Sequence, residues 1–264
     1  MNNHQFDVIY EDDNLIAVNK VSGLTTGGDR WDHSEKRLDQ LLDKYLGKKV
    51  YMLHRIDKDT SGLVIFGKNA ATHRAVGMAF EGRLVSKTYL AIIHGRPNWT
   101  SDASGEATCV CGLPLVPNGD KRHRTIVDKY HGKLSLTRFK LILSAGNYSL
   151  VEAYPETGRT HQIRVHLAAL GHPIVCDRLY GKQAFRSEEP GVYLSSFKPG
   201  WRGDAYDEKP LLNRLGLHAW KLSLPLAIFP EELRQGKTEN DLHFEAPLQK
   251  DMKALINQMK KVSQ

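Results

Sequence analysis

The sequence predicts an α+β fold on the strength of three observations. Strand-length patterns occur near both ends and in the middle of the chain, and helical patterns lie between them without strict alternation. Two of these strands, at 136–143 and 148–155, are joined by a short turn that is typical of an antiparallel hairpin. The 264 residues, 41% hydrophobic and 25% charged, suffice for a buried core. We therefore expect a mixed, mainly antiparallel sheet with helices packed on it.

The first third of the chain alternates short strands with two helices. The expected strands are residues 6–10, 15–18, 51–53 and 63–66, and the expected helices are 36–46 and 69–82. Phe6, Val8 and Tyr10 alternate along the first strand. Gly47 is a natural helix end, and Asn69 is a natural helix start.

The rest of the chain adds strands and two further helices. The expected strands are 87–95, 136–143, 148–155, 218–226 and 241–248, and the expected helices are 160–170 and 249–260. The strand 87–95 is apolar on both faces, so we expect it to be central. Thr160 is the expected N-terminal cap of its helix, and Gly171 followed by Pro173 marks the end. Residues 182–215 are expected to be irregular.

The chain is expected to form a single domain over residues 1–264. It contains no internal repeat, no low-complexity tract and no apolar run of about 18 residues that would cross a membrane. No secretory signal pattern opens the chain, and we expect no membrane partner. The core is expected at about 6–248, with a loop-rich insertion at 97–133 and a C-terminal helix within 249–264.

The charge balance favours a polyanionic partner. Lys and Arg total 37 against 30 for Asp and Glu, which gives a net charge of +7. The run KRHR at 121–124, with His131 and Lys133 soon after, forms a local cationic patch. The alternative for this patch is an ordinary solvated loop.

The cysteines point to a reducing compartment. The chain has 3 of them, Cys109, Cys111 and Cys176, an odd and sparse number that argues against a disulfide framework. We therefore expect a cytoplasmic protein. Cys109 and Cys111 are spaced too closely for the usual zinc-binding element.

The segment His54 to Gly62, HRIDKDTSG, is a polar loop between two expected core strands. Asp57 is flanked there by Arg55 and Lys58, and a carboxylate among cations stays ionised and can act as a nucleophile or base. The alternative is a salt-bridged surface loop. The segment also echoes a protein-kinase catalytic loop, but no other kinase motif accompanies it.

A second polar segment, residues 155–181, is rich in Arg and His. His161 and His166 are five positions apart, which does not place them on one helix face as metal ligands. Arg164 lies beside the apolar stripe of its helix, so its guanidinium would be partly buried and would need a carboxylate partner. We expect that partner to be Asp57.

These segments together resemble the RluA family of pseudouridine synthases. The blocks that carry the resemblance are HRIDKDTSG, SKTYLAIIHG and PETGRTHQIRVHLAALGHPIVCDRLYG, with FDVIYEDDNLIAVNKVSG before them and LHAWKLSLP and FEAPL after them. The resemblance covers most of residues 6–260. Val21 and Cys176 depart from the pattern, since the family usually has proline and glycine there.

The resemblance implies the pseudouridine synthase fold, with a central RNA-binding cleft flanked by helices and loops, and an isomerase that converts uridine in RNA to pseudouridine. It assigns the catalytic aspartate to Asp57, the arginine that pairs with it to Arg164 and the active-site tyrosine to Tyr89. Arg55 would fill the space left by a flipped base. Further substrate-binding residues are expected to be His54, Thr60, Lys87, Arg122, Arg124, Arg159, His161 and Arg178.

The expected partner is a stem-loop of ribosomal or transfer RNA, and the residues do not decide between the two. We expect a monomer that uses no cofactor and no metal and carries no S4-like RNA-binding domain. Two other classes remain as alternatives. A non-catalytic RNA-binding or folding-assistance protein would bind RNA without isomerising it. A metal-dependent hydrolase built on the histidines would lose activity with a chelator.

Overall fold

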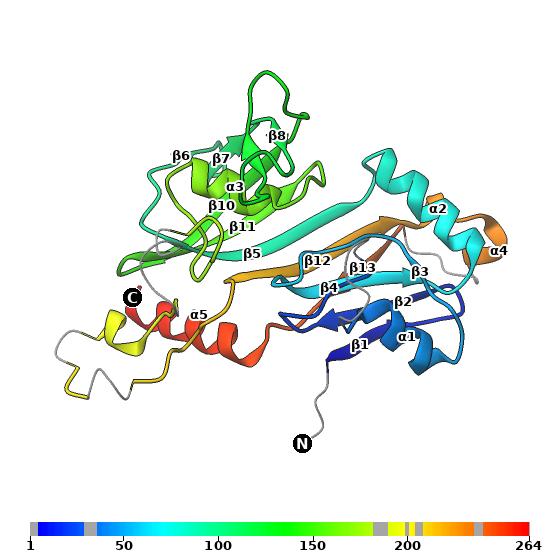
Figure 1. Ribbon diagram of the computed structural model, residues 1–264, viewed down its shortest axis with the longest axis horizontal. Coiled ribbons are helices and arrows are strands. Elements are labelled where there is room, and N and C mark those ends of the chain that lie inside the picture. Colours follow the sequence, from blue (N-terminus) through cyan, green and yellow to red (C-terminus); the bar gives the residue numbers. More distant parts are fainter. Residues whose placement is uncertain are drawn as a thin grey trace. The chain divides into compact units, whose positions relative to one another are not determined.

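The computed structural model describes residues 5–28, 36–181, 190–198, 201–203, 208–234 and 240–263. The chain divides into two compact units. Unit 1 comprises Met1–Thr88 and His218–Pro247, and unit 2 comprises Tyr89–Leu217 and Leu248–Gln264. Each unit contains mainly antiparallel strands with helices packed on them, as the α+β prediction requires (Figure 1). No helix of the described residues is long and apolar enough to cross a membrane.

Unit 1 is built around the paired strands β2 and β4. Its elements are β1 (Phe6–Glu11), β2 (Leu15–Lys20), α1 (Leu38–Leu46), β3 (Tyr51–Met52), β4 (Ser61–Gly67), α2 (Ala70–Glu81), β12 (Leu217–Pro225), the 3-10 helix η2 (Leu226–Ile228), α4 (Glu231–Arg234) and β13 (Asp241–Glu245). The strand order is β1-β2-β4-β12, with β13 also on β12 and β3 also on β4. All pairs are antiparallel except β4 with β12. Every residue of β2 and β4 is buried, so these strands form the centre of the unit.

Gly62 permits the parallel contact between β4 and β12. Its φ is +110°, and a Cβ at this position would lie 2.2 Å from the carbonyl oxygen of Ala219. Any other residue would therefore separate the two strands. The contact brings Ser61 against His218, whose Nδ1 lies 2.9 Å from Ser61 Oγ in the buried interior. The loop that precedes β4 is thus fixed at its C-terminal end.

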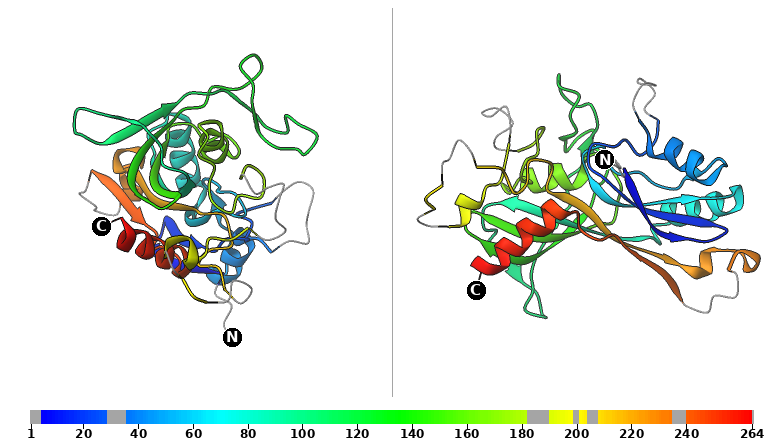
Figure 2. Two further views of the ribbon diagram at one scale, coloured as in Figure 1. Left: turned by 90° about the vertical axis from the view of Figure 1, so that its left-hand side faces the viewer. Right: turned by 90° about the horizontal axis from the view of Figure 1, so that it is seen from below.

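Unit 2 is an antiparallel array with a helix on each side. Its elements are β5 (Ser86–His94, which begins in unit 1), β6 (Thr100–Ser101), β7 (Ala107–Cys111), β8 (Leu115–Val116), β9 (Ile126–Val127), β10 (Thr137–Ala145), β11 (Tyr148–Pro155), α3 (Gln162–Ala169), the 3-10 helix η1 (Leu194–Phe197) and α5 (Lys250–Val262). The strand order is β5-β11-β10-β7-β6. Figures 1 and 2 show α3 and α5 on opposite sides of β10 and β11.

The core of unit 2 lies under α3. Ile163 and Leu167 of the helix share one buried cluster with Phe139 of β10 and Val151 of β11. Because side chains alternate along a strand, one face of these strands meets α3 and the other is left for α5. Arg164, between the two apolar residues of α3, is held at the edge of this core.

Most expected elements are confirmed, including the hairpin β10–β11, the short strands of the 97–133 insertion and the final helix. Asn69 caps α2 through its side chain, and Gly47 ends α1 with a left-handed backbone. The predicted cap at Thr160 is wrong, since His161, with φ of 55°, occupies the N-cap of α3. The side chain of Gln162, the first residue of α3, accepts the backbone N–H of Arg159, which precedes the helix. The sequence did not predict η1, η2 or α4. Part of 182–215 lies outside the described residues.

Candidate functional site

The candidate residues fall into two groups, one in each unit. Unit 1 carries His54, Arg55, Asp57, Thr60 and Lys87, and unit 2 carries Tyr89, Arg122, Arg124, Arg159, His161, Arg164 and Arg178. Asp57 is half-buried and Arg55 is exposed, on the loop between β3 and β4. In the part of the chain that the structure describes, no group of three or more His, Cys, Asp or Glu is arranged to hold a metal ion.

Lys20 anchors the loop that carries Asp57. The side chain is fully buried, and its ammonium donates hydrogen bonds to the carbonyls of Val21 (3.0 Å), Leu24 (2.7 Å) and Lys58 (3.0 Å). A buried ammonium is stable only when such acceptors replace its water. One cation therefore ties the turn after β2 to the residue that follows Asp57.

Four further hydrogen bonds fix the same loop. They are Gly23 N–H to Lys58 O (2.8 Å), Ser22 Oγ–H to Asp59 O (2.6 Å), Thr26 Oγ1–H to Ile56 O (2.9 Å) and Thr60 N–H to Asp57 O (3.1 Å). Each carbonyl from Ile56 to Asp59 thus accepts a hydrogen bond. The backbone of Asp57 is consequently rigid, which is what a residue aimed at a reacting atom requires.

His54 fixes the start of the loop as a neutral imidazole. Its Nε2 accepts the backbone N–H of Ile65 at 3.1 Å, and its ring stacks on Phe80 with centroids 5.3 Å apart. Burial, with a smaller contribution from the charge of Lys87, lowers the pKa of His54 to about 3. Burial also lowers the pKa of Lys87. Because the lone pair of Nε2 accepts the N–H of Ile65, this histidine has a structural role at the start of the loop.

Arg164 of α3 forms a buried ion pair with Asp177. Its Nε and Nη2 donate to Asp177 Oδ2 and Oδ1 at 2.8 Å and 2.9 Å. The same carboxylate accepts the backbone N–H groups of Leu179 and Tyr180. Burial alone would raise the pKa of Asp177, but the hydrogen bond and charge of Arg164, together with the backbone N–H groups of Leu179 and Tyr180, outweigh it and lower that pKa. Arg164 is therefore paired with a buried carboxylate, as expected for a buried guanidinium, but this carboxylate is Asp177, which the sequence did not single out. The expected pairing of Arg164 with Asp57 stays a prediction.

Tyr180 contacts two candidate residues of unit 2, Arg164 and His161. Its ring centroid lies 5.2 Å from the guanidinium carbon of Arg164, within cation–π range. Its hydroxyl oxygen lies 2.9 Å from Nδ1 of His161 and accepts the backbone N–H of Thr125 at 3.0 Å. Burial raises the pKa of Tyr180. This residue stands in the recognised 155–181 block, but the sequence did not single it out.

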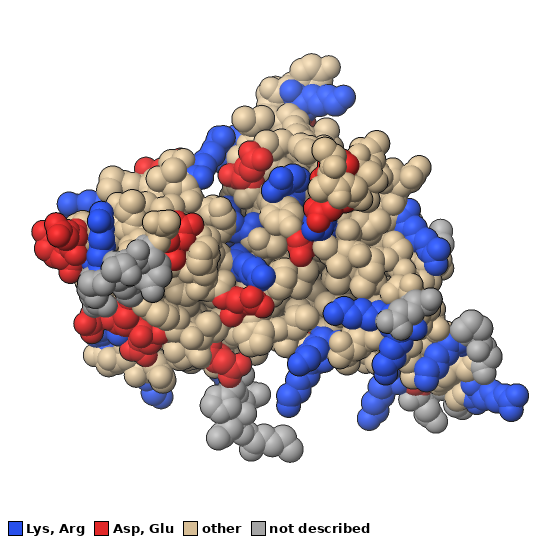
Figure 3. Space-filling view, turned by 180° about the vertical axis from the view of Figure 1, so that it is seen from behind, with Lys and Arg blue, Asp and Glu red and all other residues tan. Residues whose placement is uncertain are grey.

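Some arginines at and near the expected cationic patch are exposed, and one forms hydrogen bonds within the protein. Arg124 is half-buried and donates to Asp120 Oδ2 at 2.7 Å and to the carbonyl of Leu179 at 3.0 Å. It therefore ties the insertion to the turn after Asp177. Arg122 and Arg178 are exposed. Figure 3 shows Lys and Arg side chains gathered at the lower right of the face it displays, with Asp, Glu, Lys and Arg intermixed over the rest.

Tyr89 and Arg159 occupy two other positions in unit 2. Tyr89 lies on β5 opposite Ala153 of β11, is half-buried and packs against the core under α3. Arg159 is exposed, and its Nε donates to the carbonyl of Leu134 at 3.1 Å.

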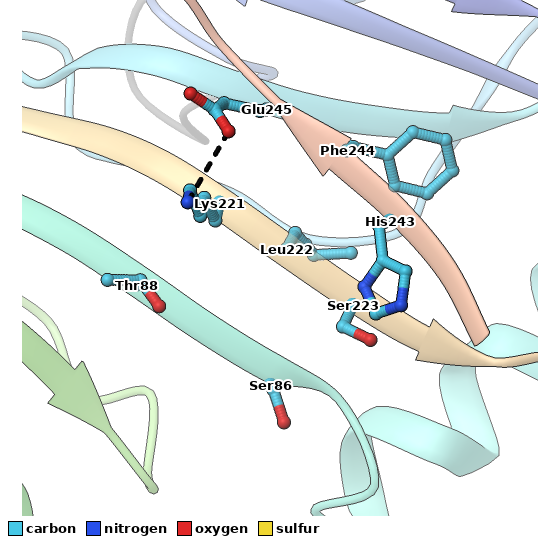
Figure 4. Close-up of a pocket in the computed structure, with 8 residues that line it drawn as sticks. All are labelled: Ser86, Thr88, Lys221, Leu222, Ser223, His243, Phe244 and Glu245. Carbon is cyan, nitrogen blue, oxygen red and sulfur yellow. Dashed lines mark ion pairs between the residues drawn. The ribbon is translucent and has the colours of Figure 1, made fainter.

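A separate groove lies in unit 1, with a volume of about 500 Å³. It is lined by Ser86, Thr88, Lys221, Leu222, Ser223, His243, Phe244 and Glu245. Figure 4 shows Lys221 and Glu245 facing one another, with Nζ and Oε2 3.4 Å apart. The groove contains none of the candidate residues named above.

The sequence of this chain is similar to those of a known protein family. Residues 14–169 match the family model described as RNA pseudouridylate synthase. The chain is 34% identical over 202 residues to ribosomal large subunit pseudouridine synthase D of Borreliella burgdorferi, covering 72% of this chain and 59% of that protein. It is 35% identical over 204 residues to dual-specificity RNA pseudouridine synthase RluA of Vibrio vulnificus, covering 73% and 78%.

A solved structure shares the fold. Human RNA pseudouridylate synthase domain containing 4 aligns with a TM-score of 0.65 at 20% identity, covering 96% of this chain and 92% of that one. The range matched by the family model, residues 14–169, includes Asp57, Tyr89 and Arg164. The chain belongs to the RluA family of RNA pseudouridine synthases.

Proposed function

We propose that this protein isomerises uridine in structured RNA to pseudouridine, with Asp57 as the nucleophile. The observation that carries the proposal is the rigid presentation of Asp57 in a chain of this family, on a loop whose four carbonyls from Ile56 to Asp59 are all hydrogen-bonded. The names of two relatives, a ribosomal large subunit enzyme and a dual-specificity RNA enzyme, favour ribosomal RNA as the substrate class, with transfer RNA as the alternative.

The reaction needs no added reactant. The bond between ribose C1′ and uracil N1 breaks, the base turns, and C1′ joins C5. The proton lost from C5 is balanced by the proton gained at N1. No electron is transferred and no group leaves the RNA, so we propose catalysis by side chains without a cofactor.

Asp57 and Arg55 would act in succession on the same loop. A uridine must leave its stack before it reaches a nucleophile, at a cost of a few kcal/mol. The exposed side chain of Arg55 would occupy the space left behind and offset part of that cost. Asp57, two residues on, would then attack the sugar or the base, or remove a proton at C2′.

Arg164 and Tyr89 would complete the catalytic group. The bond to Asp177 uses two of the five N–H donors of a guanidinium, which is compatible with a second carboxylate. We propose Asp57 as that carboxylate, which Arg164 would keep ionised. Tyr89 would stack on the uracil and accept the C5 proton in the last step.

The remaining candidates would bind or shape the RNA site. Arg122, Arg159 and Arg178 are exposed and would contact phosphates. His54, Thr60, Lys87, Arg124 and His161 are at least half-buried and would support the site around them. Neutralising an exposed phosphate contact should weaken RNA binding and flatten its salt dependence.

The test compares Asp57→Asn with Asp59→Asn, a matched control on the same loop. Turnover is measured as tritium released from RNA carrying uridine labelled at C5, and binding as a Kd for the same RNA. We expect Asp57→Asn to abolish release and retain binding, and Asp59→Asn to retain both. Substantial turnover by Asp57→Asn would overturn the nucleophile assignment. Binding without release by the unaltered protein would favour the non-catalytic alternative. Mapping pseudouridines in total RNA from cells with and without the protein identifies the substrate.

A further inference from the structure

Tyr130 is the most exposed large hydrophobic residue that the structure describes, at 93%. It lies between β9 and β10, in the insertion drawn in green around β8 in Figure 1. Leu134, four residues on, is 61% exposed. A ring in this position adds nothing to the core, and its large apolar faces are available to a partner.

The turn that carries Tyr130 is held rigidly by Asp128. Oδ1 of Asp128 accepts the backbone N–H groups of Tyr130 at 2.8 Å and His131 at 3.0 Å, and its carbonyl accepts that of Gly132 at 3.0 Å. The two side-chain-bound N–H groups hold the pKa of Asp128 below its usual range. A Cβ on Gly132 would lie 2.3 Å from the carbonyl oxygen of Asp128, so the turn requires glycine there.

Both ends of this turn are attached to the unit. The backbone N–H of Asp128 donates to the carbonyl of Pro114 at 3.0 Å. Leu115 and Lys133 exchange two backbone hydrogen bonds, of 3.0 Å and 2.9 Å. The backbone beneath Tyr130 is therefore ordered before any partner arrives, which lowers the entropy cost of binding through this ring.

Basic residues flank Tyr130 along the chain. Lys129, His131 and Lys133 are neighbours in the chain and are exposed. Arg159, also exposed, is fixed next to the same segment by its hydrogen bond to the carbonyl of Leu134. An exposed aromatic ring among cations is typical of surfaces that bind single-stranded nucleic acid, where bases stack on rings and phosphates meet charges.

We propose that Tyr130 is a stacking platform for an unpaired base of the RNA, with Lys129, Lys133 and Arg159 contacting the adjoining phosphates. The inference rests on the proposed function, because it takes RNA to be the substrate. It adds a contact with an unpaired nucleotide other than the reacting uridine. Such a contact would favour loops over continuous duplexes, since a paired base cannot offer its face to the ring.

The test uses two fluorescein-labelled RNAs, a stem-loop with a seven-nucleotide loop and a blunt duplex of the same stem. Tyr130→Ala is compared with Tyr130→Phe, which keeps the ring, and with Leu134→Ala, which removes exposed apolar surface nearby. Loss of one stacked base should weaken stem-loop binding by roughly 5- to 150-fold in Tyr130→Ala. Tyr130→Phe, Leu134→Ala and all duplex affinities should change less than about twofold. Equal stem-loop affinity of Tyr130→Ala and the unaltered protein would overturn the proposal.

A crosslinking measurement separates this inference from the proposed function. 5-Iodouridine is placed in the loop of the same stem-loop, and the crosslinked peptide is identified by mass spectrometry. We expect a crosslink at Tyr130, in the Asp57→Asn background as well. A crosslink at Tyr130 without tritium release by the unaltered protein would support the stacking platform and contradict the proposed synthase function. Normal tritium release without a crosslink at Tyr130 would support the synthase function and contradict the stacking platform.

Discussion

Arg164 and Asp177 form a bidentate ion pair with only 3% and 0% of their side chains exposed. The pair joins the middle of α3 to the turn at 177–181, where Asp177 also accepts two backbone N–H groups. The direction of the Arg164 guanidinium is therefore set inside unit 2. Asp177 is a positioning residue for Arg164.

Asp177→Asn should destabilise the protein by about 3–5 kcal/mol, because it removes the buried negative charge that accepts two hydrogen bonds from Arg164. The measurement is the free energy of unfolding from urea titration. Arg214 and Asp251 give a matched control, since they form a bidentate pair with 16% and 35% of their side chains exposed. Asp251→Asn should cost about 1 kcal/mol or less. Similar losses in the two variants would contradict a special contribution from the buried pair.

The local part of this arrangement could be predicted from the sequence. Helical spacing places Arg164 between Ile163 and Leu167, so its burial and its need for a carboxylate followed from periodicity. The hairpin β10–β11, the C-terminal end of α1 at Gly47 and the N-terminal cap of α2 at Asn69 were predictable for the same reason, because alternation and caps act over a few residues.

The partner of Arg164 could not be predicted, because it depends on the backbone of a turn. Cys176 has a φ of 57°, and this left-handed backbone directs Asp177 back to α3. A cysteine does not by itself indicate a left-handed backbone, as a glycine would. Likewise, the parallel contact of β4 with β12 joins Ser61 to His218 across the chain, and no local pattern specifies such a register. The three carbonyls around Lys20 are also brought together only by the folded loops.

The left-handed backbone at Cys176 gives a second prediction, on stability. A residue other than glycine in this conformation costs roughly 1–2 kcal/mol. Cys176→Gly removes that strain but also loses a small buried side chain, so its stability should stay within about 1 kcal/mol of the unaltered protein. Cys176→Val should be destabilised by more than about 2 kcal/mol, because a branched Cβ fits this backbone poorly.

Thermal and urea unfolding measure these changes. Cys111→Val is the matched control, since Cys111 is also buried but lies on strand β7, where branched residues are favourable. An equal loss of stability at Cys176→Val and Cys111→Val would show that crowding, and not the backbone of Cys176, determines the cost.

His54 gives a prediction for mild acid. Because its folded pKa is about 3 and an unfolded histidine titrates near 6.5, only the unfolded chain binds this proton between those values. Stability contributed by neutral His54 is therefore complete above about pH 6.5 and decreases as the pH falls toward 3. At pH 5 the expected loss is about 2 kcal/mol relative to pH 7.

The measurement is the free energy of urea unfolding from pH 7 to pH 4.5, above the range in which Asp177 would protonate. His54→Gln keeps a side-chain acceptor for the N–H of Ile65 and cannot gain a proton, so its profile should be flatter by about 2 kcal/mol at pH 5. His243→Gln is the control, because it replaces an exposed histidine of the same unit. If His54→Gln and the unaltered protein lose stability in parallel, His54 is not the group that makes unfolding acid-dependent in this range. Parallel profiles for His243→Gln and the unaltered protein, with a flatter one for His54→Gln, would assign the dependence to the histidine that fixes the start of the Asp57 loop.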